Sequence, residues 1–231
     1  NDIFVNRDPR LAMTLYKIDE NAYKGPYIPF SNQSGYGYSL KKGFILNEWT
    51  TNFKETVYKI LIRYAEVLIS YAEALYEYNG SITDAQLDLT VNALRKRVGF
   101  NVKLTNSFVT QNGLDMLNEI RRERTVEFID ENMRYDDIIR WKIAEKVLPT
   151  YILGAKFVDT ETSKQRSDMA GRLTDSNGML NGKKVCDEPD IYVIEKAEDR
   201  VFNPSKDYLY PIPINEISLS GGAVIQNPGW N

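Results

Sequence analysis

The residues best suited to chemistry lie between Ile120 and Trp141, where acidic and basic side chains crowd the sequence IRRERTVEFIDENMRYDDIIRW. Two adjacent carboxylate pairs stand out, at residues 130–131 and 136–137. Acid–base cleavage of a glycosidic bond needs two carboxyl groups that face one bond, roughly 5–9.5 Å apart. Neighbours in sequence point in different directions on a helix, so these pairs do not meet that requirement. We expect Asp136 to pair with a nearby arginine instead.

Arg124 lies on the apolar face of the same stretch. Leu117, Ile120 and Phe128 recur at helical spacing, and Arg124 falls on their face, with Glu127 one turn further on. Such charges could bind a ligand. However, a charge on an apolar face is costly unless it is paired and hydrogen-bonded, so a structural ion network is the better interpretation. We assign to this network Arg63, Arg124, Glu127, Arg134, Asp136 and Arg140.

Several other kinds of catalytic and metal site are disfavoured. The sequence contains no histidine, which removes Ser-His-Asp and Cys-His nucleophile systems and zinc sites built on histidine. Cys186 is the single cysteine, and acidic residues follow it, whereas a reactive thiol needs an electropositive setting. Asp175 to Gly178 resembles the start of a calcium loop, but Met179 and Cys186 stand where oxygen ligands are required, so a tight turn is expected. We therefore assign no catalytic residue, no metal and no cofactor, and we do not expect an enzyme.

Composition narrows the class of protein further. The 231 residues are 42% hydrophobic and 26% charged, which is ordinary for a globular chain. The net charge is −3 and no basic stripe occurs, which argues against nucleic acid as a partner. No run of about 18 apolar residues occurs, so no bilayer-spanning helix is expected.

Aromatic residues near the start of the chain form the best candidate ligand surface. They lie among Gly, Asn, Gln and Ser, and flat rings beside amide and hydroxyl groups suit both the C–H faces and the hydroxyls of a sugar. The same rings could merely pack loops onto the helical body. The candidates are Tyr23, Tyr27, Tyr36, Tyr38 and Trp49.

These residues must be positioned by a mainly α-helical fold. Tyr58 to Tyr78 predicts a long helix with one narrow polar stripe, and Asn79-Gly80 ends it. A second helix is expected from Thr83, where Gln86 completes a capping box, to Gly99. The two form a helical hairpin similar to a tetratricopeptide unit. One such unit cannot cover its own apolar faces, so a missing neighbour is expected.

The rest of the chain adds shorter elements. Two further helices are expected, from Leu114 to about Asp130 and from about Tyr135 to Leu148. Ile191 to Glu195 and Arg200 to Phe202 suggest a short β-hairpin. We expect an aromatic loop and strand region at residues 1–56, a helical core at 57–149, and loops with short β-hairpins at 150–231.

Five segments, in order, resemble the SusD/RagB family. NRDPRL near the start is followed by RYAEVLISYAEAL, VNALRKRVGF, the arginine-rich helix ending in RYDDIIRW, and the YPIP turn with the NPGW tail. The resemblance implies the C-terminal portion of a surface lipoprotein of the outer membrane, whose lipid anchor is not in this chain. It also implies a non-catalytic protein that binds glycans or other nutrients beside a SusC-like TonB-dependent transporter.

The resemblance also implies binding partners, and alternative functions remain open. The implied partners are an oligosaccharide, the transporter, and N-terminal helical repeats of the same protein. A peptide-binding or transporter-interaction module is one alternative, and a glycan-active hydrolase is another.

Overall fold

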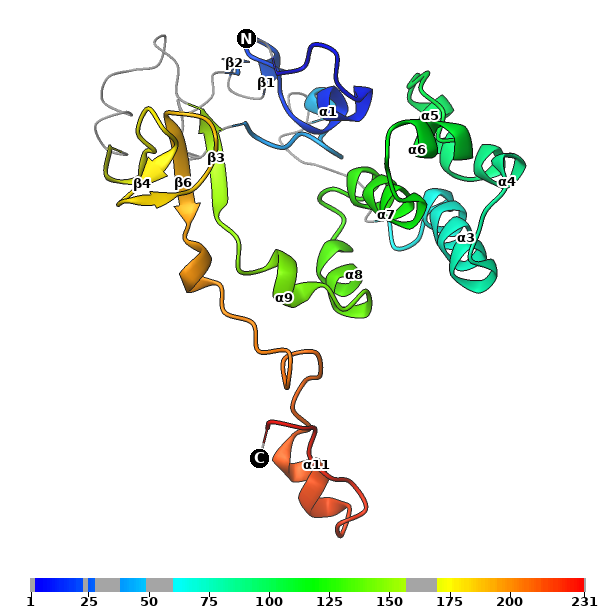
Figure 1. Ribbon diagram of the computed structural model, residues 1–231, viewed down its shortest axis with the longest axis vertical. Helices are drawn as coiled ribbons and strands as arrows, with labels where there is room; N and C mark the ends of the chain where they lie inside the picture. The colour runs from blue at the N-terminus through cyan, green and yellow to red at the C-terminus, as the bar shows by residue number, and fades with distance from the viewer. Residues whose placement is uncertain (1–2, 23–24, 28–37, 49–59, 157–169, 231) are drawn as a thin grey trace. The chain divides into compact units, whose positions relative to one another are not determined.

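The computed structural model describes residues 3–22, 25–27, 38–48, 60–156 and 170–230 (Figure 1). It is mainly helical with short antiparallel strand pairs, which confirms the expected fold class. The chain forms two compact units: residues 1–29 with 38–134, and residues 30–37 with 135–231. The three-part division expected from the sequence stays a prediction.

The described part of the first unit is built mostly from helices. They are α1 (Pro9–Thr14), α3 (Tyr64–Asn79), α4 (Asp84–Leu89), α5 (Val91–Arg97), α6 (Asn106–Gln111) and α7 (Met116–Glu127). Two short strands, β1 (Asn21–Ala22) and β2 (Gly25–Pro26), pair antiparallel. Figure 1 shows α3 (cyan) beside α7 (green), the two helices whose charged faces matter most below.

The long helix α3 is shorter than predicted at its start. Arg63 is extended, with φ −128° and ψ 157°, and the chain from Ile60 to Arg63 is not helical. The side chain of Arg63 is held by two glutamates of the α7 region, described below. At the other end Gly80 adopts φ 68° and its N–H bonds back to the carbonyl of Tyr76, as expected of a glycine that ends a helix.

The predicted second helix is two helices, α4 and α5. The capping box is confirmed: Thr83 accepts from the N–H of Gln86, and the Gln86 side chain accepts from the N–H of Thr83. The break comes at Thr90, with φ −119° and ψ −94°, whose hydroxyl donates to the carbonyl of Gln86 at 2.7 Å. Such a back-bond competes with the regular helical ladder, and the pattern of apolar residues does not reveal it.

A single apolar core joins these helices. Its members come from every helix of the unit between α3 and α7 and from the connecting loops, and they include Ile69, Ala72, Leu87, Val91, Leu104, Val109 and Ile120. Each large side chain buried in this way stabilises the fold by about 1.5–3 kcal/mol. Helix α6, which was not predicted, is capped by Thr105, whose hydroxyl accepts from the N–H of Phe108.

In the second unit, the helix predicted from Tyr135 to Leu148 is divided. Helix α8 (Arg134–Arg140) and helix α9 (Ala144–Val147) are separated by Lys142, which has φ 52°. The turn between them is closed by the N–H of Ile143, which donates to the carbonyl of Ile138 at 3.2 Å.

The predicted hairpin between residues 191–195 and 200–202 is wrong. Strand β6 (Ile191–Glu195) pairs antiparallel with β3 (Ile152–Lys156), far away in sequence. After β6 the chain forms a 3-10 turn, η2 (Ala197–Asp199), and Arg200 donates to the carbonyl of Leu148 at 2.7 Å. The segment after β6 is therefore tied to the end of the helical region instead of folding back on β6.

Two further features complete the second unit. Strands β4 (Met179–Leu180) and β5 (Lys183–Lys184) form a hairpin whose turn residues both have positive φ, 52° at Asn181 and 79° at Gly182. An Asn-Gly pair suits a turn of this kind because both residues tolerate positive φ. A short 3-10 helix, η1 (Ala170–Arg172), precedes the hairpin, and helix α11 (Ile214–Leu219) lies near the C-terminus.

The C-terminal tail is closed by side chains. The indole N–H of Trp230 lies 2.8 Å from the carbonyl of Leu209, to which it donates, and Gln226 makes two hydrogen bonds with the backbone of Ile212. Among the described residues, no helix combines the length and hydrophobicity that crossing a membrane would require.

Candidate functional site

The charged residues of the first unit converge on two buried glutamates of α7. Glu127 accepts from Arg63 at 2.5 Å, from Arg97 at 2.5 Å and from Arg10 at 3.1 Å. Its side chain is 1% exposed. Helices α1 and α5 and the start of α3 are thereby joined at one carboxylate.

Glu123 lies one turn before Glu127 and is fully buried. Arg10 lies 2.7 Å from one of its oxygens and Arg95 lies 2.8 Å from the other. Arg95 is also almost fully buried, and it donates to the backbone carbonyl of Val102 at 2.9 Å. Arg95 Nε also donates to Glu123 at 2.9 Å, so each of these buried charges has an opposite partner, without which it would be costly in a core.

Arg10 is held in this network by α1 and its N-cap residue. Asp8 is the N-cap of α1 and accepts from the backbone N–H of Arg10 at 2.9 Å and from its guanidinium at 2.6 Å. Burial by itself would raise the pKa of Asp8, but these hydrogen bonds from Arg10 lower it below its usual value. Burial would likewise lower the pKa of Arg10, yet Asp8 and Glu123 raise it, so the guanidinium stays charged.

Glu131 extends the network beyond the end of α7. It accepts from Arg63 at 2.7 Å and from Lys42 at 2.5 Å. Lys42 also donates to the carbonyl of Glu127, the last residue of α7, and to that of Ile129 just beyond it, so it helps to satisfy the carbonyls at the end of the helix. Burial tends to raise the pKa of Glu131, while hydrogen bonds from Arg63 and Lys42 lower it.

The polar stripe of α3 faces the charged stripe of α7. Arg121 lies 3.2 Å from Glu77, Arg124 donates to the hydroxyl of Ser70 at 3.2 Å, and Arg63 meets the far end of α7. Residue numbers rise along α3 as they fall along α7, so the two helices run antiparallel. The narrow polar stripe read from the sequence is therefore a helix–helix contact.

The other residues assigned to the network lie in different settings. Arg124 is buried, 5.3 Å from the ring centre of Phe128, and Arg134 donates to the hydroxyl of Thr125 at 2.9 Å. Asp136 is exposed.

The arginine contact that was expected for Asp136 is made by the adjacent residue, Asp137. Asp137 is buried and accepts from Arg140 at 2.9 Å. The guanidinium of Arg140 also lies 4.9 Å from the ring centre of Trp141. The helix places Asp137 inward, and sequence alone did not distinguish the two adjacent aspartates.

Sequence reasoning missed seven members of the network: Asp8, Arg10, Lys42, Arg95, Arg97, Glu123 and Glu131. A signal existed for one of them, because Glu123 precedes Glu127 by one turn on the same helix face. The two arginines of α5 lie in its last turn, where a cation is favourable at a helix end without any ion pair, so their type and position alone do not indicate the network. Nothing in the sequence indicated that α1 would meet α7.

Two of the aromatic candidates lie in the described residues, and both pack. Tyr27 stacks on Tyr16 with ring centres 5.4 Å apart, and its hydroxyl accepts from the N–H of Ser39 at 2.7 Å. Tyr38 meets Phe4 edge to face at 5.7 Å. The remaining candidates, Tyr23, Tyr36 and Trp49, lie outside the described residues.

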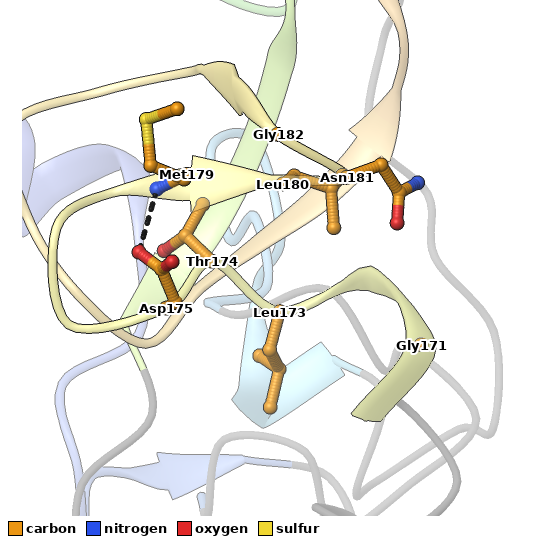
Figure 2. Close-up of a pocket in the computed structure, with 8 residues that line it drawn as sticks. All are labelled: Gly171, Leu173, Thr174, Asp175, Met179, Leu180, Asn181 and Gly182. Atoms are coloured by element: carbon orange, nitrogen blue, oxygen red, sulfur yellow. Dashed lines mark hydrogen bonds between the residues drawn. The ribbon is translucent and has the colours of Figure 1, made fainter.

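The second unit holds a shallow pocket of about 530 Å³ beside the β4–β5 hairpin (Figure 2). Figure 2 shows Leu173, Thr174 and Asp175 on one side of it and the β4–β5 hairpin on the other. Asp175 accepts from the N–H groups of Asn177 and Met179 at 2.8 and 3.0 Å, and these bonds lower its pKa. The segment is therefore the tight turn that was expected, with the carboxylate bound to its own backbone.

Gly178 shows how closely this turn is packed. It has φ 70°, and a Cβ atom at its position would lie 2.1 Å from the carbonyl oxygen of Cys186. Within the part of the chain that the structure describes, no group of three or more acidic, histidine or cysteine side chains is arranged to hold a metal ion.

The charged residues described above bind one another within the protein. Glu123, Glu127 and Glu131 are each held by two or more cations, and such a carboxylate is poorly suited to move a proton to or from a ligand. The arrangement is a structural clamp that joins α1, α3, α5 and α7.

Solved structures share this fold. A SusD-like carbohydrate-binding protein from Bacteroides fragilis is 28% identical, with a TM-score of 0.67, and the match covers 93% of this chain and 41% of that one. A second SusD-like protein from Bacteroides fragilis is 26% identical, with a TM-score of 0.64, 99% of this chain and 41% of that one being covered.

A third structure shows likeness of fold alone. It is a SusD homologue from Bacteroides thetaiotaomicron, 17% identical with a TM-score of 0.55, and the match covers 96% of this chain and 41% of that one. The chain therefore spans 41% of the length of each of these three structures.

Sequence comparison gives the family. No curated protein matches the chain significantly. The model of the SusD family matches residues 1–230, which is all but the last residue. The chain belongs to the SusD family.

Proposed function

We propose that this chain is part of a protein that binds glycans at the cell surface and does not transform them. The observation that carries the proposal is the family match over residues 1–230, together with a similar structure described as a SusD-like carbohydrate-binding protein. That structure is 28% identical over most of this chain. The same kind of ligand is the simplest function for the present chain.

The ion network supports a binding role over a catalytic one. A glycosidase needs two carboxyl groups free to face the scissile bond. The buried carboxylates of α7 are paired with arginines that hold the unit together. Using these carboxylates for catalysis would break the pairs and destabilise the fold. Their arrangement favours a rigid scaffold that carries its ligand surface on loops.

The ligand surface is proposed to lie on the aromatic loops between residues 20 and 50. Tyr27 packs against Tyr16, and Tyr38 packs against Phe4. We therefore propose that Tyr27 and Tyr38 hold these loops in place. Tyr23, Tyr36 and Trp49 remain the candidates for stacking on a sugar ring.

We further propose that the protein works at the outer membrane. As a surface lipoprotein, it would pass bound glycan to a SusC-like TonB-dependent transporter. Because the chain spans 41% of the length of its structural relatives, we also propose that helical repeats from the rest of the same protein complete the fold.

A glycan array on the complete protein tests this proposal, with Tyr36→Ala and Trp49→Ala as variants. A matched control is Tyr210→Ala, which removes a tyrosine that is 74% exposed and lies outside these loops. We expect binding by the parent and the control, and at least tenfold weaker binding by both loop variants.

Other outcomes would favour the rivals. Release of reducing sugar that is abolished by one Asp or Glu substitution would identify a glycan-active hydrolase. Binding to a peptide library with no binding to any glycan would identify a peptide-cargo or transporter-interaction module.

A further inference from the structure

The chain contains four Asn-Gly pairs, and the sequence alone does not distinguish them. In such a pair the backbone nitrogen of glycine can attack the side-chain carbonyl carbon of asparagine, because glycine carries no Cβ atom that would hinder the approach. The reaction requires a glycine N–H and an asparagine amide that are free to move toward each other. The pairs are Asn79-Gly80, Asn112-Gly113, Asn177-Gly178 and Asn181-Gly182.

The pair at the end of α3 is held by two hydrogen bonds. The N–H of Gly80 donates to the carbonyl of Tyr76 at 2.8 Å. The side-chain amide of Asn79 donates to the carbonyl of Leu75 at 3.0 Å. Both reacting groups must therefore release an acceptor before they can meet, and the energy of those hydrogen bonds opposes the reaction.

The pair at the end of α6 is held in the same way. The N–H of Gly113 donates to the carbonyl of Thr110 at 3.2 Å. The side-chain amide of Asn112 donates to the carbonyl of Phe108 at 2.8 Å. The end of this helix thus restrains the nucleophile and the amide together.

The third pair is held by close packing. Gly178 is buried, and its N–H donates to the carbonyl of Asp175 at 3.0 Å. A Cβ atom at Gly178 would lie 2.1 Å from the carbonyl oxygen of Cys186, so the backbone has no room to rotate there. The carbonyl of Asn177 also accepts from Lys184 at 2.6 Å.

The fourth pair has none of these restraints. Asn181 and Gly182 form the exposed tip between β4 and β5, and a Cβ atom at Gly182 would meet nothing within 4 Å. Among the contacts of the described residues, the Gly182 N–H donates to no acceptor and the Asn181 side chain makes no hydrogen bond. Figure 2 shows the amide of Asn181 directed away from the other labelled side chains.

We propose that Asn181 is a site of spontaneous deamidation. The Gly182 N–H loses its proton to hydroxide, and the nitrogen forms a bond to Cγ of Asn181. The Cγ–Nδ2 bond breaks and ammonia leaves, so a five-membered succinimide ring results. Water then opens the ring, giving aspartate by attack at the side-chain carbonyl or isoaspartate by attack at the main-chain carbonyl. One water is consumed and one ammonia is released, with no oxidation or reduction.

The isoaspartate product changes the hairpin itself. Its main chain runs through the former side chain and is longer by one methylene group. The register of a hairpin is fixed by the length of its turn, and here the turn has two residues. A longer tip cannot keep the pairing of Leu180 with Lys183 and of Met179 with Lys184. Because Leu180 and Met179 also line the pocket beside the hairpin, the modification alters that pocket.

Peptide mapping of the complete protein tests the choice of site. The protein is incubated in mildly alkaline buffer and digested, and mass spectrometry follows conversion of each amide to an acid. We expect Asn181 to react about fivefold or more faster than each of the other three asparagines, since a typical hydrogen bond that must first break restrains a group by about fivefold. In urea, where the fold is lost, the four rates should become similar. A pair that reacts as fast as Asn181 in the folded protein would overturn the assignment, and so would a ranking that urea leaves unchanged.

Hydrogen exchange tests the effect on the hairpin. Anion exchange isolates the deamidated protein through its added negative charge, and electron-transfer fragmentation identifies the fraction that holds isoaspartate. Amides of residues 179–184 should exchange at least tenfold faster in that fraction than in the parent. The matched control is Asn181→Asp, which adds the same charge without lengthening the main chain and should exchange as the parent does. Unchanged exchange in the isoaspartate fraction, or equally fast exchange in the control, would contradict this account of the hairpin.

Discussion

Glu123 is the residue of the ion network whose loss is expected to cost the most. It is fully buried, and its partner Arg95 is 2% exposed and is bound to no other carboxylate among the contacts that the structure describes. Truncation to alanine leaves the Arg95 guanidinium buried without its counter-charge. Breaking a buried pair in this way costs about 3–5 kcal/mol, so we expect Glu123→Ala to lower the free energy of unfolding by that amount.

Glu119→Ala is the matched control. Glu119 lies one turn earlier on α7 and is nearly as buried, but its partner Arg122 is 49% exposed at the side chain. Water can therefore solvate the arginine left behind, and the expected loss is about 1 kcal/mol or less.

A double substitution separates the ion pair from mere loss of volume. Replacing both partners with apolar residues of similar size removes the unpaired charge, which is often close to neutral. Glu123→Leu with Arg95→Met should therefore cost about 2 kcal/mol less than the sum of the two single changes, a coupling typical of residues in one network.

Urea unfolding followed by far-UV circular dichroism measures all of these variants. The reasoning is refuted if Glu123→Ala costs no more than Glu119→Ala. Strict additivity of the two single changes would equally contradict the assignment of Arg95 and Glu123 as a coupled pair.

Two further predictions concern acid and the β4–β5 hairpin. The pKa values of Asp8 and Glu131 are lower in the folded protein than in the unfolded chain, where they are about 4. The stability that these carboxylates contribute is therefore present above about pH 4 and is lost as the pH falls through their folded-state pKa values. Tm should fall on acidification below about pH 4, and a constant Tm between pH 5 and pH 3 would contradict this. Gly178→Ala should lower the Tm of the second unit more than Gly182→Ala, because both glycines have positive φ but only at Gly178 would the added methyl group meet a backbone carbonyl; equal losses would contradict the packing.

The helical content and several ends of elements followed from sequence because they depend on local chemistry. Thr83 with Gln86 is a cap, Gly80 ends α3, and Asn181-Gly182 closes a hairpin, all within a few residues of chain. The polar stripe of α3 was also visible, although its partner was not.

Long-range pairing was not predictable in the same way. Strand β6 was assigned a neighbour close by in sequence, whereas it pairs with β3 about forty residues earlier. Likewise, Arg10 reaches Glu123 across more than a hundred residues, and no local pattern marks that contact. The break at Thr90 depends on one hydroxyl that bonds backward, which periodicity cannot register.

In the candidate site, too, local features could be predicted from the sequence and non-local ones could not. The inward position of Arg124 could be predicted because a helix face is a local property. Which of two adjacent aspartates turns inward, Asp136 or Asp137, depends on the rotation of α8 against its surroundings, and the sequence does not specify it.

The measurement that tests the central claim most directly follows one oligosaccharide through binding and release. The complete protein is equilibrated with the best ligand from a glycan array, the bound sugar is eluted with denaturant, and its mass is compared with the starting material. We predict saturable binding and recovery of the intact sugar after prolonged incubation. Recovery of shortened products, or absence of saturable binding to every glycan tried, would contradict the account of a non-catalytic glycan-binding protein.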